Sequence, residues 1–320
     1  FFLTGAITMQ AGHQATGSHP VADKCPRRAF LARAVSAAGA ACLAPHLLAA
    51  ASTPQVRTAA DLVPLGNTGL KISRIGFGTG SVGGSVQRAL GQDTFNDLIR
   101  YGFERGITYI DAAQTYATFE WIGGAIRGLP REKLFLQSKI PGQPEDVLQA
   151  IDHHRQVFDT DYIDSLLIHC MVKDGWTDTM RRVMDGFEEA KRRQWIRVQG
   201  VSCHSLPALR TAVASDWPDV HLVRVNPQAK QIDGPEETWD KPGDDIAPVV
   251  EQLQLMQAKG RGVIGMKLIG EGAFVDPEDR QRSLQFAMAH SAINSVAIGF
   301  KNRQEIDEAI ERVDRALASL

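Results

Sequence analysis

The sequence predicts an α/β fold of the (β/α)8 TIM-barrel type. Three successive apolar segments of strand length end at Asp111, Lys139 and His169, and segments with the apolar spacing of helices alternate with them. The stretch from residue 62 to residue 320 also has about the usual length of a single barrel of this kind. The chain is therefore expected to fold as one barrel after an N-terminal segment.

The residues at these strand ends are expected to lie together, because the C-terminal ends of all strands meet at one mouth of a parallel barrel. A buried lone carboxylate is costly, so Asp111 is expected to pair with Lys139. Tyr116 follows five residues after Asp111, where its hydroxyl can face the cleft. A nearby ammonium lowers the phenol pKa of about 10, so Tyr116 suits proton donation to a carbonyl oxygen, which His169 can also hydrogen-bond.

This order of Asp111, Tyr116, Lys139 and His169 resembles the aldo-keto reductase superfamily, from about residue 63 to the end of the chain. Taken singly, each residue is more often a helix cap or a packing, surface or core residue. The resemblance implies NAD(P)H-dependent reduction of a small aldehyde or ketone by hydride transfer. Tyr116 is then the proton donor, Lys139 lowers its pKa, Asp111 orients Lys139, and His169 positions the carbonyl.

Composition excludes several other classes. The 320 residues carry a net charge of −2, so no nucleic-acid partner is expected. No stretch after residue 60 is long and apolar enough to span a membrane. The four cysteines, Cys25, Cys42, Cys170 and Cys203, show no CxxC spacing, which argues against a metal site or a disulfide framework. With a regular pleat, the Cys170 side chain is expected to point away from the barrel interior and to serve packing.

The first 51 residues are predicted to be an export leader. Arg27 and Arg28, followed by Phe-Leu and an alanine-rich stretch, resemble a twin-arginine signal, and small residues precede Ser52 as at a cleavage site. Residues 52–61 are expected to be a linker. The protein is then periplasmic, free of the membrane once the signal is removed, and dependent on a redox partner to recycle its cofactor. An alanine-rich leader or uncleaved anchor, with a cytoplasmic protein, is the alternative.

The remaining elements follow in chain order. Residues 63–70 form a short hairpin with a Gly-Asn turn signal, which in the resembled family closes the barrel floor. The other strands are expected at residues 75–80, 196–204, 220–225, 262–268 and 295–299. Helices are expected at residues 94–105, 120–127, 145–158, 180–193 and 305–317.

The resemblance also implies cofactor contacts. The family places nicotinamide near Gly78 and Thr79, whose neighbouring glycines allow close backbone approach. Ser202 and Cys203 occupy the run in which the family uses Ser and Asn to hold the carboxamide, and Cys203 replaces the Asn. Asn226, just after a strand, completes this group.

On the strand at residues 220–225 the family commonly has Gln, where this chain has Leu222 or Arg224. The sequence leaves open whether Arg224 faces the mouth or the exterior. In the long acidic loop that follows, Trp239 is a candidate substrate wall or an ordinary exposed residue.

Two cationic segments are expected to face the cofactor phosphates. Lys267 ends a strand and is expected to reach the pyrophosphate or the substrate, with a salt bridge to Glu271 as the alternative. Gly299, Lys301, Asn302, Arg303 and Glu305, at the start of the last helix, resemble the family's adenosine-phosphate clamp. Lys301 and Arg303 favour the 2′-phosphate of NADP(H), whereas Glu305 suits the free ribose hydroxyl of NAD(H). NADP(H) is expected and NAD(H) is the alternative.

Two other functions use the same residues. Lys139 is a possible Schiff-base nucleophile of a lyase, although a neighbouring Asp111 keeps it charged. A non-catalytic barrel that binds a cofactor or a partner is the second alternative.

Overall fold

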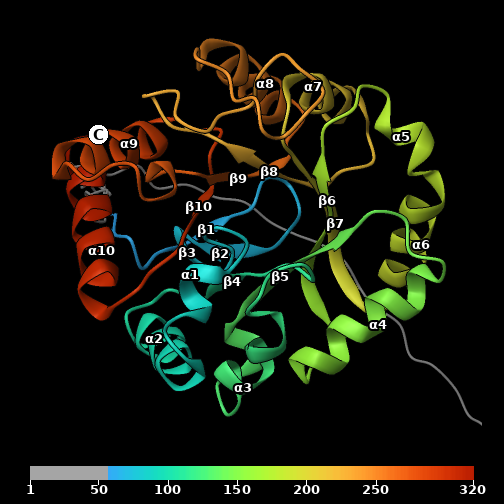
Figure 1. The fold of residues 1–320 in the computed structure, drawn as a ribbon, viewed down its shortest axis with the longest axis horizontal. Helices are drawn as coiled ribbons and strands as arrows, with labels where there is room; N and C mark the ends of the chain where they lie inside the picture. The colour runs from blue at the N-terminus through green and yellow to red at the C-terminus, as the bar shows by residue number, and fades with distance from the viewer. Residues whose placement is uncertain (1–56) are drawn as a thin grey trace, which may run out of the picture. The chain divides into compact units, whose positions relative to one another are not determined.

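The computed structural model describes residues 57–320, and the predicted leader and most of the predicted linker lie outside these residues. Eight parallel strands form a closed barrel in the order β10-β3-β4-β5-β6-β7-β8-β9, which confirms the predicted fold. Figure 1 shows the helices arranged around these strands. The strands are β3 (Ile75–Gly78), β4 (Tyr109–Asp111), β5 (Phe135–Pro141), β6 (Ile163–Met171), β7 (Ile196–Cys203), β8 (Val220–Arg224), β9 (Gly262–Met266) and β10 (Ser295–Ile298).

Helices lie between successive strands of the barrel, and one further helix follows the last strand. They are α1 (Ser85–Arg88), α2 (Gln92–Glu104), α3 (Ile122–Ile126), α4 (Val147–Phe158), α5 (Trp176–Thr179), α6 (Arg181–Arg192), α7 (Leu206–Ala214), α8 (Ala247–Ala258), α9 (Pro277–Ala289) and α10 (Arg303–Ala318). Short 3-10 turns occur at Phe119–Trp121, Arg131–Lys133 and Gly270–Gly272. Among residues 57–320, no helix has both the length and the apolar character needed to cross a bilayer.

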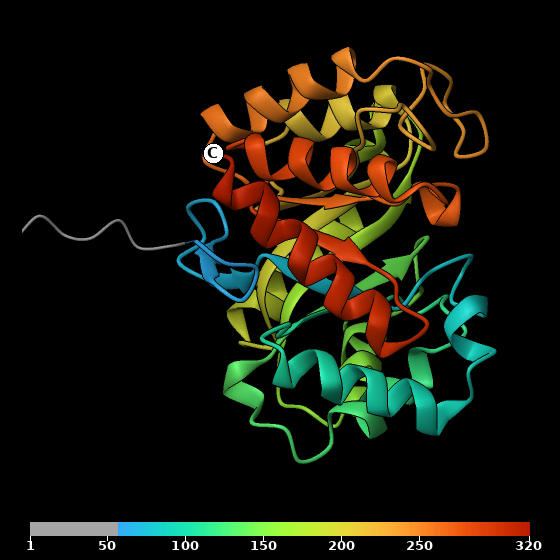
Figure 2. The same ribbon diagram turned by 90° about the vertical axis from the view of Figure 1, so that its left-hand side faces the viewer.

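A hairpin of β1 (Leu62–Pro64) and β2 (Lys71–Ser73) covers one end of the barrel. A Cβ on Gly66 would lie 2.5 Å from the main chain of Arg261 and Gly262, where β9 begins, so the hairpin loop lies against the N-terminal strand ends. Figure 2 shows the hairpin, in blue, at this end. The hairpin is wider than predicted, because residues 65–70 form its connecting loop instead of a tight turn.

The pleat of the strands separates two buried layers. The layer inside the barrel includes Tyr109, Phe135, Leu167, Leu222 and Ile264, and the larger layer lies between strands and helices. Because side chains alternate along a strand, the residues two positions after these apolar ones also face inward, nearer the mouth. The inner face is therefore apolar toward the floor and polar toward the mouth.

The mouth lies at the C-terminal ends of the strands, opposite the hairpin. A connection from residue 225 to residue 246 joins β8 to α8 there, and Figure 2 shows it at the upper right. This segment is predicted as a long acidic loop, yet Asp233 within it is completely buried.

Candidate active site

Lys139 is the centre of the polar layer, and its side chain is 1% exposed. Its Nζ donates to Asp111 Oδ1 and Oδ2, at 2.8 and 2.9 Å, and to the carbonyl oxygen of Ala112 at 2.9 Å. It also donates to Tyr116 Oη at 3.2 Å. Strands β4 and β5 pair directly, which brings the carboxylate and the ammonium together. The structure thus brings Asp111, Lys139 and Tyr116 into contact, as the sequence predicts.

The charges of this group follow from burial and from the neighbours. Burial lowers the pKa of Lys139, but the charges of Asp111 and Tyr116 and their hydrogen bonds outweigh it, so the pKa is raised and the amine stays an ammonium. Burial raises the pKa of Tyr116 more than Lys139 lowers it. The lysine acts in the predicted direction, but the net pKa of Tyr116 lies above its usual value. Tyr116 is therefore a protonated phenol at neutral pH, as a proton donor must be.

His169 packs edge-on against Tyr116, with ring centroids 5.7 Å apart and an interplanar angle of 82°. Its Nδ1 lies 3.3 Å from the hydroxyl of Thr115. Burial, together with the charge of Lys139, lowers the pKa of His169 to about 3. The imidazole is neutral at physiological pH, so it can take part in hydrogen bonds without adding charge to the mouth.

Gln137 holds the Asp111 carboxylate from the side nearer the barrel floor, a role that the sequence analysis did not predict. Its amide donates to Asp111 Oδ1 at 2.9 Å and to Tyr109 Oη at 2.7 Å, and accepts from Ser165 Oγ at 2.9 Å. This network fixes the carboxylate that holds Lys139. The signal was available, because Gln137 stands two positions before Lys139 and so faces inward on the same strand.

Gly80 leaves the space that the Tyr116 ring fills. A Cβ at this position would lie 2.3 Å from Tyr116 Cζ and 2.8 Å from its Oη. The glycine is therefore needed for close approach to the phenol, not only for a bend in the chain.

Cys170 does not lie on the regular pleat that its predicted orientation assumes. The pleat is not regular there, since the β6–β7 register shifts between Ile168 and Met171 and Cys170 has a φ of 61°. Burial raises the pKa of the Cys170 thiol, and the charges of Arg224 and Asp233 also act on it. The regular pleat on which the predicted orientation of the Cys170 side chain depends is therefore absent here.

Several side chains that were predicted to contact the cofactor instead form hydrogen bonds within the protein. Cys203 faces the outside of the barrel, where its Sγ contacts the carbonyl oxygen of Ala208 on α7 at 3.5 Å. The prediction that Cys203 contacts the carboxamide is therefore wrong. Ser202 Oγ accepts the Cys170 N–H at 3.0 Å. Thr79 is buried, and its hydroxyl donates to the carbonyl oxygen of Asp111 at 2.9 Å.

The residues after β8 and β9 stabilise the mouth loops. The side-chain amide of Asn226 donates to the carbonyl oxygens of Lys230 and Lys267, at 2.7 and 3.1 Å. Lys267 Nζ lies 2.7 Å from Glu271, so the salt bridge named as the alternative is present. Arg224, whose direction the sequence left open, is 3% exposed and faces the mouth.

The predicted phosphate clamp lies at the start of α10. Asn302 caps this helix by accepting from the Glu305 N–H at 2.9 Å, and Glu305 accepts from the Lys301 N–H at 2.8 Å. Lys301 Nζ also lies 3.4 Å from Glu305, and the Arg303 guanidinium stacks over the Tyr101 ring at 4.8 Å. Gly78 ends β3 and Gly299 follows β10, and a Cβ on Gly78 would lie 3.3 Å from the main-chain nitrogen of Gly299.

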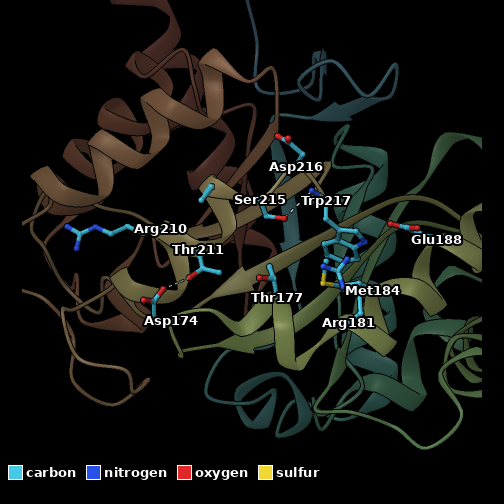
Figure 3. A pocket seen from close by; sticks show the side chains of 11 residues that line it. Asp174, Thr177, Arg181, Met184, Glu188, Arg210, Thr211, Ser215, Asp216 and Trp217 are labelled. Atoms are coloured by element: carbon cyan, nitrogen blue, oxygen red, sulfur yellow. Dashed lines mark hydrogen bonds between the residues drawn. The ribbon is translucent and has the colours of Figure 1, made fainter.

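A separate hollow of about 820 Å³ lies on the outside of the barrel, along α5, α6 and α7. Figure 3 shows its lining side chains, including the hydrogen-bonded pair of Asp174 and Thr211. None of the predicted site residues lines it. This hollow is therefore distinct from the barrel mouth.

Comparison with known proteins agrees with the fold. The chain is 32% identical over 122 residues to probable aldo-keto reductase 1 of Glycine max, which covers 33% of the chain and 35% of that protein. It is 31% identical over 146 residues to 9,11-endoperoxide prostaglandin H2 reductase of Trypanosoma cruzi, covering 44% of the chain and 50% of that protein. The matches thus span about a third to a half of the length of these two relatives.

Among solved structures, an aldo/keto reductase from Klebsiella pneumoniae in complex with NADP and acetate has the same fold. It superposes with a TM-score of 0.61 at 19% identity, covering 81% of this chain and 93% of that one. The Aldo/keto reductase family matches residues 74–319, nearly the whole barrel, and the chain therefore belongs to this family.

Proposed function

We propose that the protein reduces a small aldehyde or ketone to an alcohol with NADPH, and that Tyr116 donates the proton. The observation that carries this proposal is the contact of the Tyr116 phenol with a buried ammonium at 3.2 Å. The ammonium is itself fixed by two carboxylate oxygens and a main-chain carbonyl.

A dihydronicotinamide held at the mouth would supply the hydride for the carbonyl carbon. Tyr116 Oη gives its proton to the carbonyl oxygen as the C=O π bond breaks, so an alcohol forms and a phenolate remains. Lys139 stabilises this phenolate because its ammonium already lies within hydrogen-bonding distance. Asp111 keeps Lys139 charged and aimed, and the neutral His169 beside the phenol orients the carbonyl.

The residues present fit a phosphate-bearing cofactor. Lys301 and Arg303 flank the N-terminus of the 16-residue helix α10, where the helix dipole favours an anion. The NADP-bound relative supports NADP(H), although Glu305 beside Lys301 leaves NAD(H) as the second choice. A Michaelis constant at least tenfold lower for NADPH than for NADH is the expected outcome.

The Schiff-base alternative requires a neutral amine at Lys139. The raised pKa of Lys139 and its two bonds to Asp111 disfavour that form. Borohydride trapping of a carbonyl compound on Lys139 would favour the lyase.

Tyr116→Phe tests the reductase. We expect kcat to fall about 10²–10⁴-fold, with the free energy of unfolding nearly unchanged. Tyr162→Phe is the matched control, because it removes the same hydroxyl from the residue just before β6, at the opposite end of the barrel. A fall below threefold in Tyr116→Phe would contradict the proton-donor role, and equal NADPH oxidation with and without carbonyl compounds would favour the non-catalytic barrel.

We also propose that the protein is exported through the twin-arginine route and works in the periplasm with a partner that recycles its cofactor. Paired arginines before an apolar segment support this. Replacing Arg27 and Arg28 with lysines should abolish periplasmic accumulation, and an unchanged periplasmic yield would refute export by this route.

A further inference from the structure

Arg224 places an enclosed guanidinium at the barrel mouth. Leu222 belongs to the inner apolar layer, so Arg224, two residues later on β8, faces inward one layer nearer the mouth. Its side chain is 4% exposed. Both terminal nitrogens donate to the carbonyl oxygen of Trp239 at 3.3 Å, and Nη2 contacts His204 Nδ1.

No hydrogen-bonded carboxylate neutralises this guanidinium among residues 57–320. The nearest carboxylate, Asp233, lies 3.6 Å from Arg224 Nε and is completely buried. Arg224 Nε and both carboxylate oxygens of Asp233 lack hydrogen-bond partners. Buried pairs of this type usually close to about 2.7–2.9 Å. Arg224 thus retains donor capacity that the fold does not use, and Asp233 compensates its positive charge only from 3.6 Å.

The guanidinium lies within reach of the proposed chemistry but not directly at it. The His204 ring, which it contacts, lies 6.4 Å from the His169 ring, and that ring lies 5.7 Å from the Tyr116 ring. Burial lowers the pKa of His204 well below its usual value, so it adds no competing charge. A molecule whose carbonyl is at Tyr116 therefore reaches Arg224 only with a part several bonds away.

The geometry of the donors selects the class of group. The two terminal nitrogens hold one planar sp² oxygen, the Trp239 carbonyl, by long bonds. A carboxylate in its place forms shorter, charge-assisted bonds with the planar fork. The neighbouring Asp233 disfavours a doubly charged phosphate more than a singly charged carboxylate. Trp239 is 63% exposed on its loop, so its displacement opens the position to solvent.

We propose that Arg224 binds a carboxylate at the end of the substrate remote from the carbonyl, so that the preferred substrates are ω-oxo acids. This inference rests on the reductase function proposed above, and it names the substrate class of that site. Arg224 is then a specificity-determining residue, and the bound carboxylate takes the place of the Trp239 carbonyl on its guanidinium.

The test compares aldehydes of equal chain length with and without a terminal carboxylate, such as 4-oxobutanoate with butanal and 6-oxohexanoate with hexanal. We expect kcat/KM of the wild type to favour the carboxylates at least about tenfold. In Arg224→Gln that ratio should fall to near one. Arg210→Gln removes the same charge from the outer hollow, far from the mouth residues, and should leave the ratio unchanged.

Asp233→Asn separates binding from a structural role of the ion pair. It keeps the guanidinium and removes the competing carboxylate, so the preference for carboxylates should rise about threefold or more. If the ion pair served only a structural role, Arg224→Gln and Asp233→Asn would both lose activity on aldehydes with and without the carboxylate. A wild-type ratio near one, or a ratio that falls equally in Asp233→Asn and Arg224→Gln, would overturn the proposal.

Binding of glutarate, with neutral glutaramide as its control, gives a readout that needs no turnover. Calorimetry on the wild-type protein should detect glutarate binding and little glutaramide binding, and Arg224→Gln should weaken the former at least about tenfold. If the wild type reduces no carbonyl compound, the reductase proposal fails, whereas glutarate binding still tests Arg224. If aldehydes are reduced but glutarate does not bind, only the role of Arg224 is refuted. If Arg224→Gln does not fold, glutarate binding by the wild type and the carboxylate preference of Asp233→Asn test the role of Arg224.

Discussion

Replacing Gly80 with alanine tests whether the position of the Tyr116 ring controls the chemical step. The added Cβ would lie 2.3 Å from Tyr116 Cζ, 2.4 Å from Cε2 and 2.8 Å from Oη. Ordinary carbon contacts begin at about 3.4–3.5 Å, so the ring must move by about 1 Å. Gly80 does not have a left-handed φ, so the alanine itself is not strained.

The shift separates the phenol from its ammonium. The bond from Lys139 Nζ to Tyr116 Oη already measures 3.2 Å, so a further displacement of about 1 Å breaks it. A misplacement of this size costs about 10²-fold in rate. The bonds between Lys139 and Asp111 do not involve the ring, so the fold should lose only about 1–3 kcal/mol from overpacking.

Steady-state kcat with NADPH and a reducible aldehyde, together with urea unfolding, measures both effects. Gly102→Ala is the matched control, because a Cβ there meets Phe77 at an ordinary 3.6 Å within helix α2. It should leave kcat unchanged and stabilise the helix by roughly 0.5–1 kcal/mol. A kcat of Gly80→Ala within threefold of the wild type would refute the reasoning that the glycine sets the position of the phenol.

Two further predictions concern the buried polar groups. Gln137→Leu leaves Asp111, Tyr109 and Ser165 without their shared partner and should lower the free energy of unfolding by about 2–4 kcal/mol in urea; a loss under 1 kcal/mol would show that the network contributes little. Burial raises the pKa of Asp233 from 3.8 to about 7, against the lowering by Arg224, so its contribution to stability is full below about pH 4 and is lost as the pH rises through 7. Relative to Asp233→Asn, the wild type should lose up to about 4 kcal/mol between pH 4 and pH 8, and parallel pH profiles of the two proteins would contradict this assignment.

The sequence predicts the barrel and the central residues because both depend on local patterns. Asp111 ends β4, and Lys139 and His169 lie two residues before the ends of β5 and β6, so the parallel strands bring all three to one mouth. The alternation along each strand also carries Gln137 to the inner face, so this residue was within reach of the same reasoning.

The features that escaped prediction depend on contacts between distant segments. The bulge at Cys170 arises where β6 meets β7 and the Ser202 hydroxyl takes the Cys170 N–H, which no pattern within β6 reveals. Asp233 belongs to an acidic loop that composition assigns to the surface. It is nevertheless buried, and the same loop places the Trp239 carbonyl against Arg224.

Two buried ion pairs lie at the mouth, Lys139 with Asp111 and Arg224 with Asp233. They differ in geometry, and this difference fits a catalytic role for the first pair and a substrate-binding role for the second. Lys139 is bonded to both oxygens of Asp111, and its remaining donors reach Ala112 and the phenol, so the pair holds a single geometry for proton transfer. Arg224 and Asp233 stay 3.6 Å apart with unused donors and acceptors. A buried charge left in this state costs free energy unless another group meets it. A ligand whose carboxylate meets the Arg224 guanidinium would offset this free-energy cost on binding. Of the two pairs, only Arg224 and Asp233 have unused donors and acceptors for such a ligand.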